Sequence, residues 1–240
     1  MATIVPELPA EQPESFGSDL AGMGSFFIDP TGAAKYVFRK WFWLGPLIVV
    51  GVISLVTYYL TLPMIQHVLE VTPPPANTPP EQYQKGMEIG MMVQRIVAIL
   101  MPVWIAAIYA VSALILFAMC SVLSVNAKFL WLFNLLAGCS LIQLLGSIAG
   151  FVILRAKGEV STMAELRPAL GLDIFMPESA NKYAVALLGY FSVFEIWWIV
   201  MMVLVFSAAF RVGKGKAFAV ILPLIILSLL FRVVGAAFQR

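Results

Sequence analysis

Residues 183–210 read YAVALLGYFSVFEIWWIVMMVLVFSAAF, and a second apolar run follows at residues 217–234. Only the basic turn RVGKGK, residues 211–216, separates the two runs. Each run is long enough to cross a bilayer core of about 30 Å, for which roughly 20 apolar residues are needed. The stretch therefore predicts two transmembrane helices that form an antiparallel hairpin.

The composition places the whole chain among membrane proteins. Of its 240 residues, 61% are hydrophobic and 12% are charged, whereas soluble domains have about 25% charged residues. The net charge of +2 is small, and no basic patch is interleaved with aromatic residues, so nucleic-acid binding is excluded. We expect an all-α polytopic membrane bundle.

Three further apolar blocks bring the predicted number of transmembrane helices to five. The predicted spans are residues 42–65, 96–123, 129–154, 183–210 and 217–234. The second span is the end of a longer predicted helix, which begins at a capping-box pattern near Pro79. Because that helix is about twice as long as a bilayer core is thick, its first part should project into the aqueous layer.

The N-terminal segment, residues 1–25, is acidic and rich in proline and contains no Lys or Arg. A secretory signal peptide needs a basic start and an apolar centre, and this segment has neither. We therefore predict a disordered acidic tail, followed by a membrane domain over residues 26–240.

A short helix is predicted at the start of the membrane domain. Asp29 is a suitable N-cap, and Pro30 suits the first turn. The apolar residues that follow are spaced along one helix face, with Lys35, Arg39 and Lys40 around the other side. This pattern predicts a helix lying in the membrane interface, and an ordinary basic flank of the first span is the alternative.

Glu195 is the only acidic residue within the five predicted spans, more than ten residues from the nearest predicted loop. A carboxylate at that depth needs a partner, a proton or a water-lined cavity. Glu195 and Arg232 lie at nearly equal distances from the middle of the turn at Lys214, so they are expected at the same height. The sequence predicts a Glu195–Arg232 pair; the alternative is a snorkelling Arg232 and a protonated Glu195.

Other spans carry polar side chains at a similar predicted depth. We expect them to form, with Glu195, an intramembrane polar layer in one half of the bundle. The other members of this layer are Thr57, Tyr58, Tyr109, Gln143 and Arg232.

The third span contains Gly146 and Gly150, four residues apart. Small residues at this spacing allow another helix to approach closely. Packing within the chain is the preferred interpretation, and a homo-oligomer contact through these glycines is the alternative.

Basic residues are concentrated beside the short N-terminal helix and in the last turn. We identify them as candidate contacts with lipid headgroups, and their density close to helix ends favours a cytoplasmic N-terminus. These residues are Lys35, Arg39, Lys40, Arg211, Lys214 and Lys216.

No catalytic constellation is found in the sequence. A single histidine, His67, excludes a multi-histidine metal site. Cys120 and Cys139 lie in or beside predicted spans without C-x-x-C spacing, so they are interpreted as buried thiols. We predict no enzymatic activity, no cofactor and no metal.

Two short segments of the sequence resemble segments found in membrane proteins of the Yip (Ypt/Rab-interacting) domain family. Residues 27–30, Phe-Ile-Asp-Pro, followed by Trp43-x-x-Pro46 at the first span, are similar to the family's start, and residues 186–198 with the basic turn are similar to its last hairpin. The resemblance implies five spans, a cytosolic N-terminus and, in eukaryotic members, binding of Ypt/Rab GTPases. The short tail departs from the longer tails of trafficking members, which favours a member from the bacterial cytoplasmic membrane.

Two functional hypotheses follow from the sequence. The leading one is a non-enzymatic protein that organises membrane lipids or partner membrane proteins through its interfacial helix and its bundle. The alternative is a small transporter or channel subunit in which Glu195 binds a proton or a cation. The alternative predicts a water-filled cavity at Glu195, but the sequence has no inverted repeat to support it.

Overall fold

The computed structural model describes residues 16–72, 79–162, 165–177 and 180–237, and helices account for most of them. The helices are α1 (Phe16–Ile28), α2 (Pro30–Val37), α3 (Leu44–Val71), α4 (Pro80–Val122), α5 (Phe129–Lys157), the 3-10 helix η1 (Leu172–Phe175), α6 (Lys182–Tyr190), α7 (Val193–Phe210) and α8 (Lys214–Ala237). Five of them, α3, α4, α5, α7 and α8, are long and apolar enough to cross a membrane. The predicted all-α, five-span architecture is therefore confirmed.

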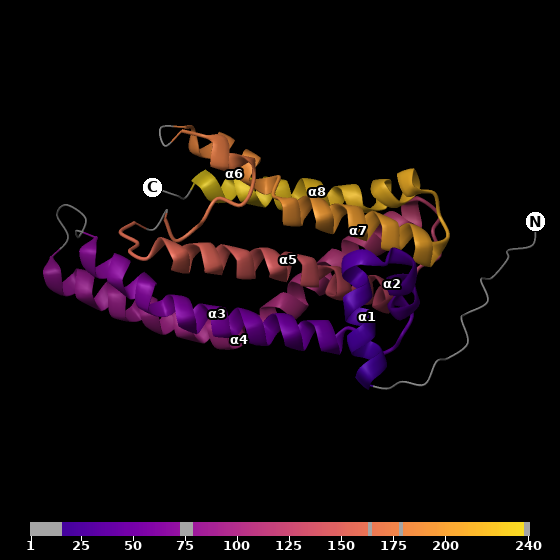
Figure 1. Ribbon diagram of the computed structural model, residues 1–240, viewed down its shortest axis with the longest axis horizontal. Helices are drawn as coiled ribbons and strands as arrows, with labels where there is room; N and C mark the ends of the chain where they lie inside the picture. Colours follow the sequence, from indigo (N-terminus) through magenta and orange to yellow (C-terminus); the bar gives the residue numbers. More distant parts are fainter. Residues whose placement is uncertain (1–15, 73–78, 163–164, 178–179, 238–240) are drawn as a thin grey trace, which may run out of the picture.

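The five long helices run side by side, with α5 between the α3–α4 pair and the α7–α8 pair (Figure 1). Helices α1 and α2 lie across one end of this bundle, close to the turn between α7 and α8. We call this the N-terminal end, and the opposite end, near α6 and the last residues of α8, the C-terminal end. Because α5 contacts α3, α4 and α7, it is the central helix of the fold.

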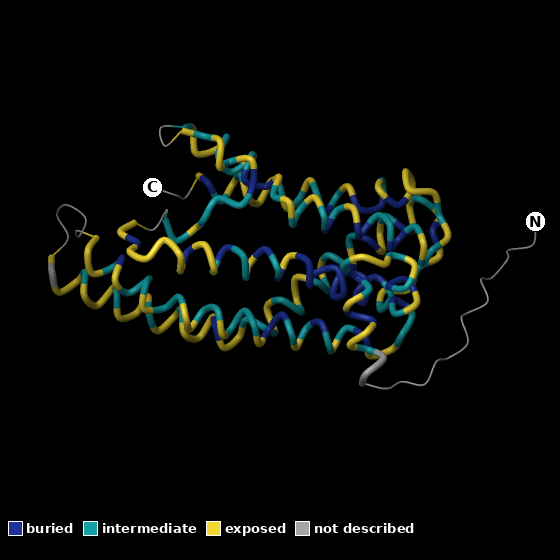
Figure 2. The backbone as a smooth tube through the Cα atoms, viewed as in Figure 1, coloured by how far each residue is buried: buried dark blue, intermediate teal, exposed yellow. Residues whose placement is uncertain are grey.

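The core is concentrated toward the N-terminal end, where buried residues gather (Figure 2). Residues 132–142 of α5 are all buried, and a helix that is buried on every face lies at the centre of a bundle. Fully buried side chains from the surrounding elements complete this packing. They include Phe42, Leu116, Met202, Phe206 and Ile221.

Helix α4 presents large apolar side chains on the outside of the bundle. Val103 is 68% exposed and Trp104 is 67% exposed. Apolar side chains that face outward along a span are those that contact lipid in a membrane protein. The exposed surface of α4 is therefore consistent with its identification as a membrane span.

Residues 16–25, predicted to belong to a disordered tail, instead form most of α1. Phe26, at the end of α1, is fully buried and stacks on the ring of Phe42 with centroids 5.3 Å apart. Its ring also occupies the space above Gly138 of α5, where an added Cβ atom would overlap it. The tail prediction was wrong here because distant packing partners order the segment; residues 1–15 lie outside the described residues.

The helix predicted after Asp29 is confirmed as α2. The Asp29 Oδ1 atom accepts a hydrogen bond from the Gly32 N–H at 2.9 Å, as expected for an N-cap. Ala34 and Val37 are buried, and α2 packs against α5 and α7. The apolar face of α2 therefore covers the end of the bundle rather than facing lipid.

Asn134 of α5 fixes the segment between α2 and α3. Its side chain is fully buried, and its amide nitrogen donates to the carbonyls of Val37 at 2.9 Å and Arg39 at 2.5 Å. Its Oδ1 atom accepts from the Trp43 N–H at 3.1 Å. One side chain thus satisfies three backbone groups near the end of one helix and the start of the next, where backbone groups lack helical partners.

The predicted fourth span, residues 183–210, is broken into two helices. Helix α6 ends at Tyr190, and α7 begins at Val193 after a short link. The Ser192 hydroxyl accepts a hydrogen bond from the Glu195 N–H at 3.1 Å and so caps α7. The prediction of one continuous helix was wrong because Ser-x-x-Glu provides a local helix start within an apolar run. Glu195 consequently lies in the first turn of α7, not deep inside a span.

Candidate functional site

An open cavity of about 390 Å³ lies in the C-terminal half of the bundle between α3, α5 and α7. The loop between α5 and α6 contributes Leu166, Pro168 and Leu170 to its lining. Six polar residues also line it: Thr57 and Thr61 from α3, Gln143 and Ser147 from α5, the α7 cap Ser192, and Glu195. The cavity lining brings Glu195 together with polar groups of α3 and α5.

Glu195 is half-buried on the wall of this cavity. The Gln143 Nε2 atom donates a hydrogen bond to Glu195 Oε2 at 3.4 Å, which is a long distance for such a bond. The Tyr190 phenol of α6 also interacts with the Glu195 carboxylate, and it lies 2.9 Å from the Ser228 hydroxyl of α8. Polar groups of α5, α6, α7 and α8 are thus connected around Glu195.

The predicted ion pair between Glu195 and Arg232 is not formed. Arg232 is exposed on α8, and it acts on Glu195 only through a longer-range electrostatic attraction. Counting residues from the turn at Lys214 gave the height of Glu195 and Arg232 along the hairpin. It did not give the direction in which each side chain points around its helix axis. Glu195 faces α5 and the cavity, whereas Arg232 lies on an exposed face.

The two tyrosines of the predicted polar layer do not line the cavity. Tyr109 packs against Phe133 with ring centroids 6.3 Å apart, and its hydroxyl interacts with Ser140. Tyr58 contacts Tyr59, and its buried hydroxyl has no hydrogen-bond partner among the described residues. The structure therefore brings Gln143, Glu195 and the neighbouring Thr57 together, and places Tyr58, Tyr109 and Arg232 elsewhere.

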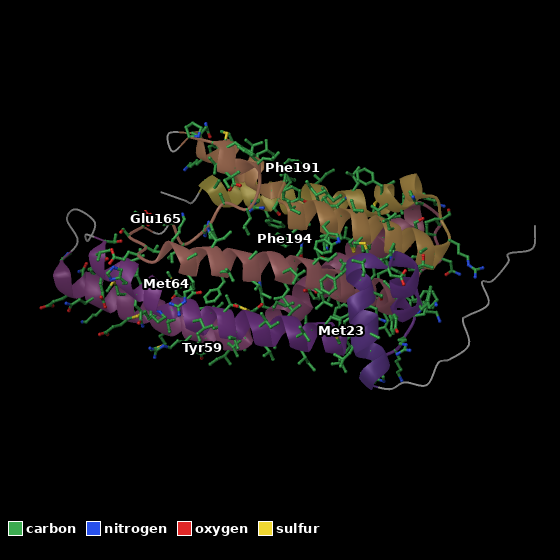
Figure 3. The ribbon with its side chains drawn as sticks, in the orientation of Figure 1. Met23, Tyr59, Met64, Glu165, Phe191 and Phe194 are labelled. Atoms are coloured by element: carbon green, nitrogen blue, oxygen red, sulfur yellow. The ribbon has the colours of Figure 1, made fainter. Side chains whose placement is uncertain are left out.

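The glycine face of α5 is occupied by the chain itself. An added Cβ atom at Gly146 would lie 3.1 Å from the ring of Phe194, which sits between α7 and α5 in Figure 3. At Gly150 it would lie 3.4 Å from Leu170 and Pro168. These contacts agree with internal packing, and they leave no room for the alternative homo-oligomer contact through the two glycines.

The loop that borders the cavity is held by local hydrogen bonds. Glu165 Oε2 accepts from the Ser161 N–H at 2.9 Å, and the Thr162 hydroxyl accepts from the Glu165 N–H at 3.3 Å. The bond from the Ser161 N–H lowers the pKa of the Glu165 carboxyl. The ionised form of Glu165 thus helps to fix the loop just before the residues that line the cavity.

The candidate headgroup contacts divide into two groups at the N-terminal end. Arg39 is used internally, because its Nη1 atom forms an ion pair with Asp19 of α1 at 2.5 Å and its guanidinium lies over the Tyr36 ring. The others have exposed positions on α2, the following segment and the last turn. These are Lys35, Lys40, Arg211, Lys214 and Lys216.

Three residues that shape these sites, Ser192, Asn134 and Trp197, were not predicted from the sequence. Ser192 was identifiable from its spacing to Glu195, which matches a capping box. Asn134 was identifiable as an amide within an apolar helix, where a polar side chain needs partners. Trp197 gave no such signal, because its indole N–H donates at 2.9 Å to the carbonyl of Phe27, which is distant in the sequence.

The family model of the Yip1 domain matches residues 23–235. The matched region begins within α1 and includes the Glu195 cavity and the basic turn between α7 and α8. No curated protein and no solved structure matches the chain.

Proposed function

The chain belongs to the Yip1 domain family, and we propose from its architecture that it is a non-enzymatic, multi-pass membrane protein that organises lipids at its N-terminal end. The observation that carries this proposal is the α1–α2 layer, which packs across that end beside a set of exposed basic residues. Asn134 and Trp197 hold the layer to the bundle. A rigid basic surface at one end of a membrane bundle suits the binding of anionic headgroups.

The charge distribution at this end supports a basic surface. The carboxylates of Asp19 and Asp29 are already engaged, the first by Arg39 and the second as the cap of α2. Trp41, which follows the layer, is 52% exposed, and tryptophan is enriched at the membrane–water interface. Each Lys or Arg near an anionic surface contributes about 1 kcal/mol to binding. Several such residues together favour anionic over neutral lipid.

Lys214 and Lys216 offer the sharpest test, because both are exposed in the first turn of α8. The full-length protein is purified in a mild detergent, and binding of phosphatidylglycerol and phosphatidylcholine is measured by native mass spectrometry. The wild type should bind phosphatidylglycerol better. Lys214→Gln with Lys216→Gln should weaken that binding more than tenfold, since about 2 kcal/mol is lost.

The matched control removes two exposed lysines from the other end of the bundle, by Lys85→Gln with Lys157→Gln. This control variant should retain the preference of the wild type for phosphatidylglycerol. Equal loss in both double variants would show that net charge, rather than the basic surface, governs binding. Unchanged binding in the Lys214/Lys216 variant would contradict the proposal.

The same basic residues support a cytoplasmic location for the N-terminal end, since short basic segments beside span ends remain in the cytoplasm. Cys120 and Cys139 are buried, so a cysteine introduced by Lys214→Cys provides a specific label site. We expect a membrane-impermeant maleimide to label it only after cells are permeabilised. Labelling in intact cells would contradict this orientation.

A second candidate function is transport of a proton or cation through Glu195, and the cavity favours it because Glu195 is accessible there. The packed core of α5 over residues 132–142 lies between the cavity and the N-terminal end. A path across the membrane would require this packing to open. We therefore expect no flux in proteoliposomes; a proton or cation flux abolished by Glu195→Gln would instead support transport.

A further inference from the structure

We propose that the cavity beside Glu195 binds a primary ammonium group, carried by an aminophospholipid headgroup or by a free amine. The cavity is built from groups of three helices and one loop, and its polar residues face a common space. Its chemistry differs from that of the basic N-terminal end, so the two sites select different ligands.

The charge of the cavity favours a cation. Glu195 is the only ionisable side chain among the described lining residues, and no Lys, Arg or His is among them. The Gln143 amide provides one long hydrogen bond and the Tyr190 phenol a second interaction, to a carboxylate that can accept about four hydrogen bonds. The carboxylate therefore retains acceptor capacity toward the cavity.

The side chain of Glu195 is not used to cap its own helix. In a complete capping box the Glu side chain accepts from the N–H of the N-cap residue. Here the Ser192 N–H instead donates to the Tyr190 carbonyl at 2.9 Å. The Glu195 carboxylate instead points to Gln143 of α5 and to the cavity, so it is available for contacts outside its own helix.

The hydroxyl groups of the cavity act as acceptors. The Thr61 hydroxyl donates to the Thr57 carbonyl at 2.8 Å, and the Ser147 hydroxyl donates to the Gln143 carbonyl at 3.3 Å. A hydroxyl has one proton to donate, so the lone pairs of these oxygens remain for a ligand. Because the Gln143 Nε2 atom bonds to Glu195, the Gln143 Oε1 atom is a further acceptor. The cavity thus presents acceptors from α3, α5 and α7.

A primary ammonium matches this set, since it has three N–H donors and no acceptor. A quaternary ammonium has no N–H group and is recognised by the faces of aromatic rings, of which Trp is the most favourable. The only aromatic side chains among the described lining residues are Phe151 and Phe194. The polar lining therefore favours an ethanolamine-type headgroup over a choline-type headgroup.

The position of the cavity suits a lipid headgroup. Glu195 lies in the first turn of α7, a helix of 18 residues with a length of about 27 Å. A bilayer core is about 30 Å thick, so the first turn of α7 lies near its boundary. The cavity is open rather than enclosed, so a headgroup could enter it from the boundary region.

The test compares two lipids that differ only in the methylation of the headgroup nitrogen. Native mass spectrometry of the full-length protein measures binding of dioleoyl phosphatidylethanolamine and dioleoyl phosphatidylcholine. We expect the wild type to prefer phosphatidylethanolamine, and Glu195→Gln to reduce its binding about tenfold or more, since a hydrogen bond to a charged group is stronger than one between neutral groups. Glu159→Gln, at an exposed position outside the cavity, should leave it unchanged.

Two additions identify the source of the ammonium group and protect against misfolding. Free ethanolamine that displaces the lipid would assign the site to a free amine, and lack of displacement would assign it to the headgroup. If Glu195→Gln does not fold, Ser147→Ala serves as a second cavity variant. It removes one acceptor at an exposed lining residue and should weaken binding of phosphatidylethanolamine several-fold. Equal binding of the two lipids, or full binding by the cavity variants, would overturn the proposal.

Discussion

The Gln143 amide of α5 donates a hydrogen bond to the Glu195 carboxylate of α7 across 3.4 Å at the edge of an open cavity. This contact, rather than an ion pair with Arg232, orients the acidic residue of the fourth span. Because Ser192 starts α7 just before Glu195, the carboxylate lies at the end of the span, where polar groups are tolerated. The buried acid suggested by the sequence is therefore a cavity residue near the membrane boundary.

Arg232→Gln should change stability little. Arg232 is exposed and makes no ion pair with Glu195, and surface substitutions of this kind are usually within about 0.5 kcal/mol. Thermal unfolding in detergent measures the effect. A large loss of thermal stability in Arg232→Gln, together with normal stability in the charge-reversed double variant Glu195→Arg with Arg232→Glu, would show that the two charges do pair.

Asn134→Ala should destabilise the protein by several kcal/mol. The change leaves three buried or partly buried backbone groups unpaired, at a cost of about 1–3 kcal/mol for each buried group. Proteolysis within α1 and α2 should become faster, because Asn134 fixes the segment that follows them. Asn126→Ala, at an exposed position, is the matched control and should behave as the wild type; equal effects of the two changes would refute the role of Asn134.

Gly138→Ala should displace the Phe26 ring, because an added Cβ atom at Gly138 overlaps that ring. Overpacking of this kind costs about 1–3 kcal/mol. Gly24→Ala is the control, since a Cβ atom there meets no neighbour, and it should be neutral or stabilising by about 0.5–1 kcal/mol. Melting temperatures of the two variants compare these effects, and a stable Gly138→Ala protein would argue against the docked position of α1.

The loop beside the cavity should loosen in acid. The pKa of Glu165 is lowered in the folded protein, so its contribution is fully present above its ordinary pKa and is lost as the pH falls through the lower folded value. Hydrogen exchange of the Ser161 and Glu165 amides, corrected for intrinsic rates, should show protection that declines below about pH 4. Glu165→Gln should remove this pH dependence; if it persists in the variant, another group is responsible.

Local sequence patterns predicted much of the fold. Apolar block lengths gave the five spans, and the Asp29–Pro30 pair gave the start of α2. Local patterns did not predict α1, because its order depends on a partner distant in the sequence. The Phe26 ring at the end of α1 fills the space that Gly138 leaves on α5. The link before Ser192 was missed because its capping pattern lies within an apolar run, where a continuous helix was expected.

The candidate site was predictable only in part, for a geometric reason. Position along a helix can be counted from a turn. The count put Gln143 and Glu195 at a similar height, and in the structure their side chains are in contact. The direction of a side chain around its helix depends on packing, which separated Arg232 and Tyr109 from the cavity.

Lipid organisation by the N-terminal end can be measured on the lipids that stay with the protein when it is extracted from membranes in polymer nanodiscs. We expect anionic lipid to be enriched over its share of the parent membrane, and Lys214→Gln with Lys216→Gln to remove the enrichment. Retained lipid with the composition of the parent membrane, in the wild type and the variant alike, would contradict it.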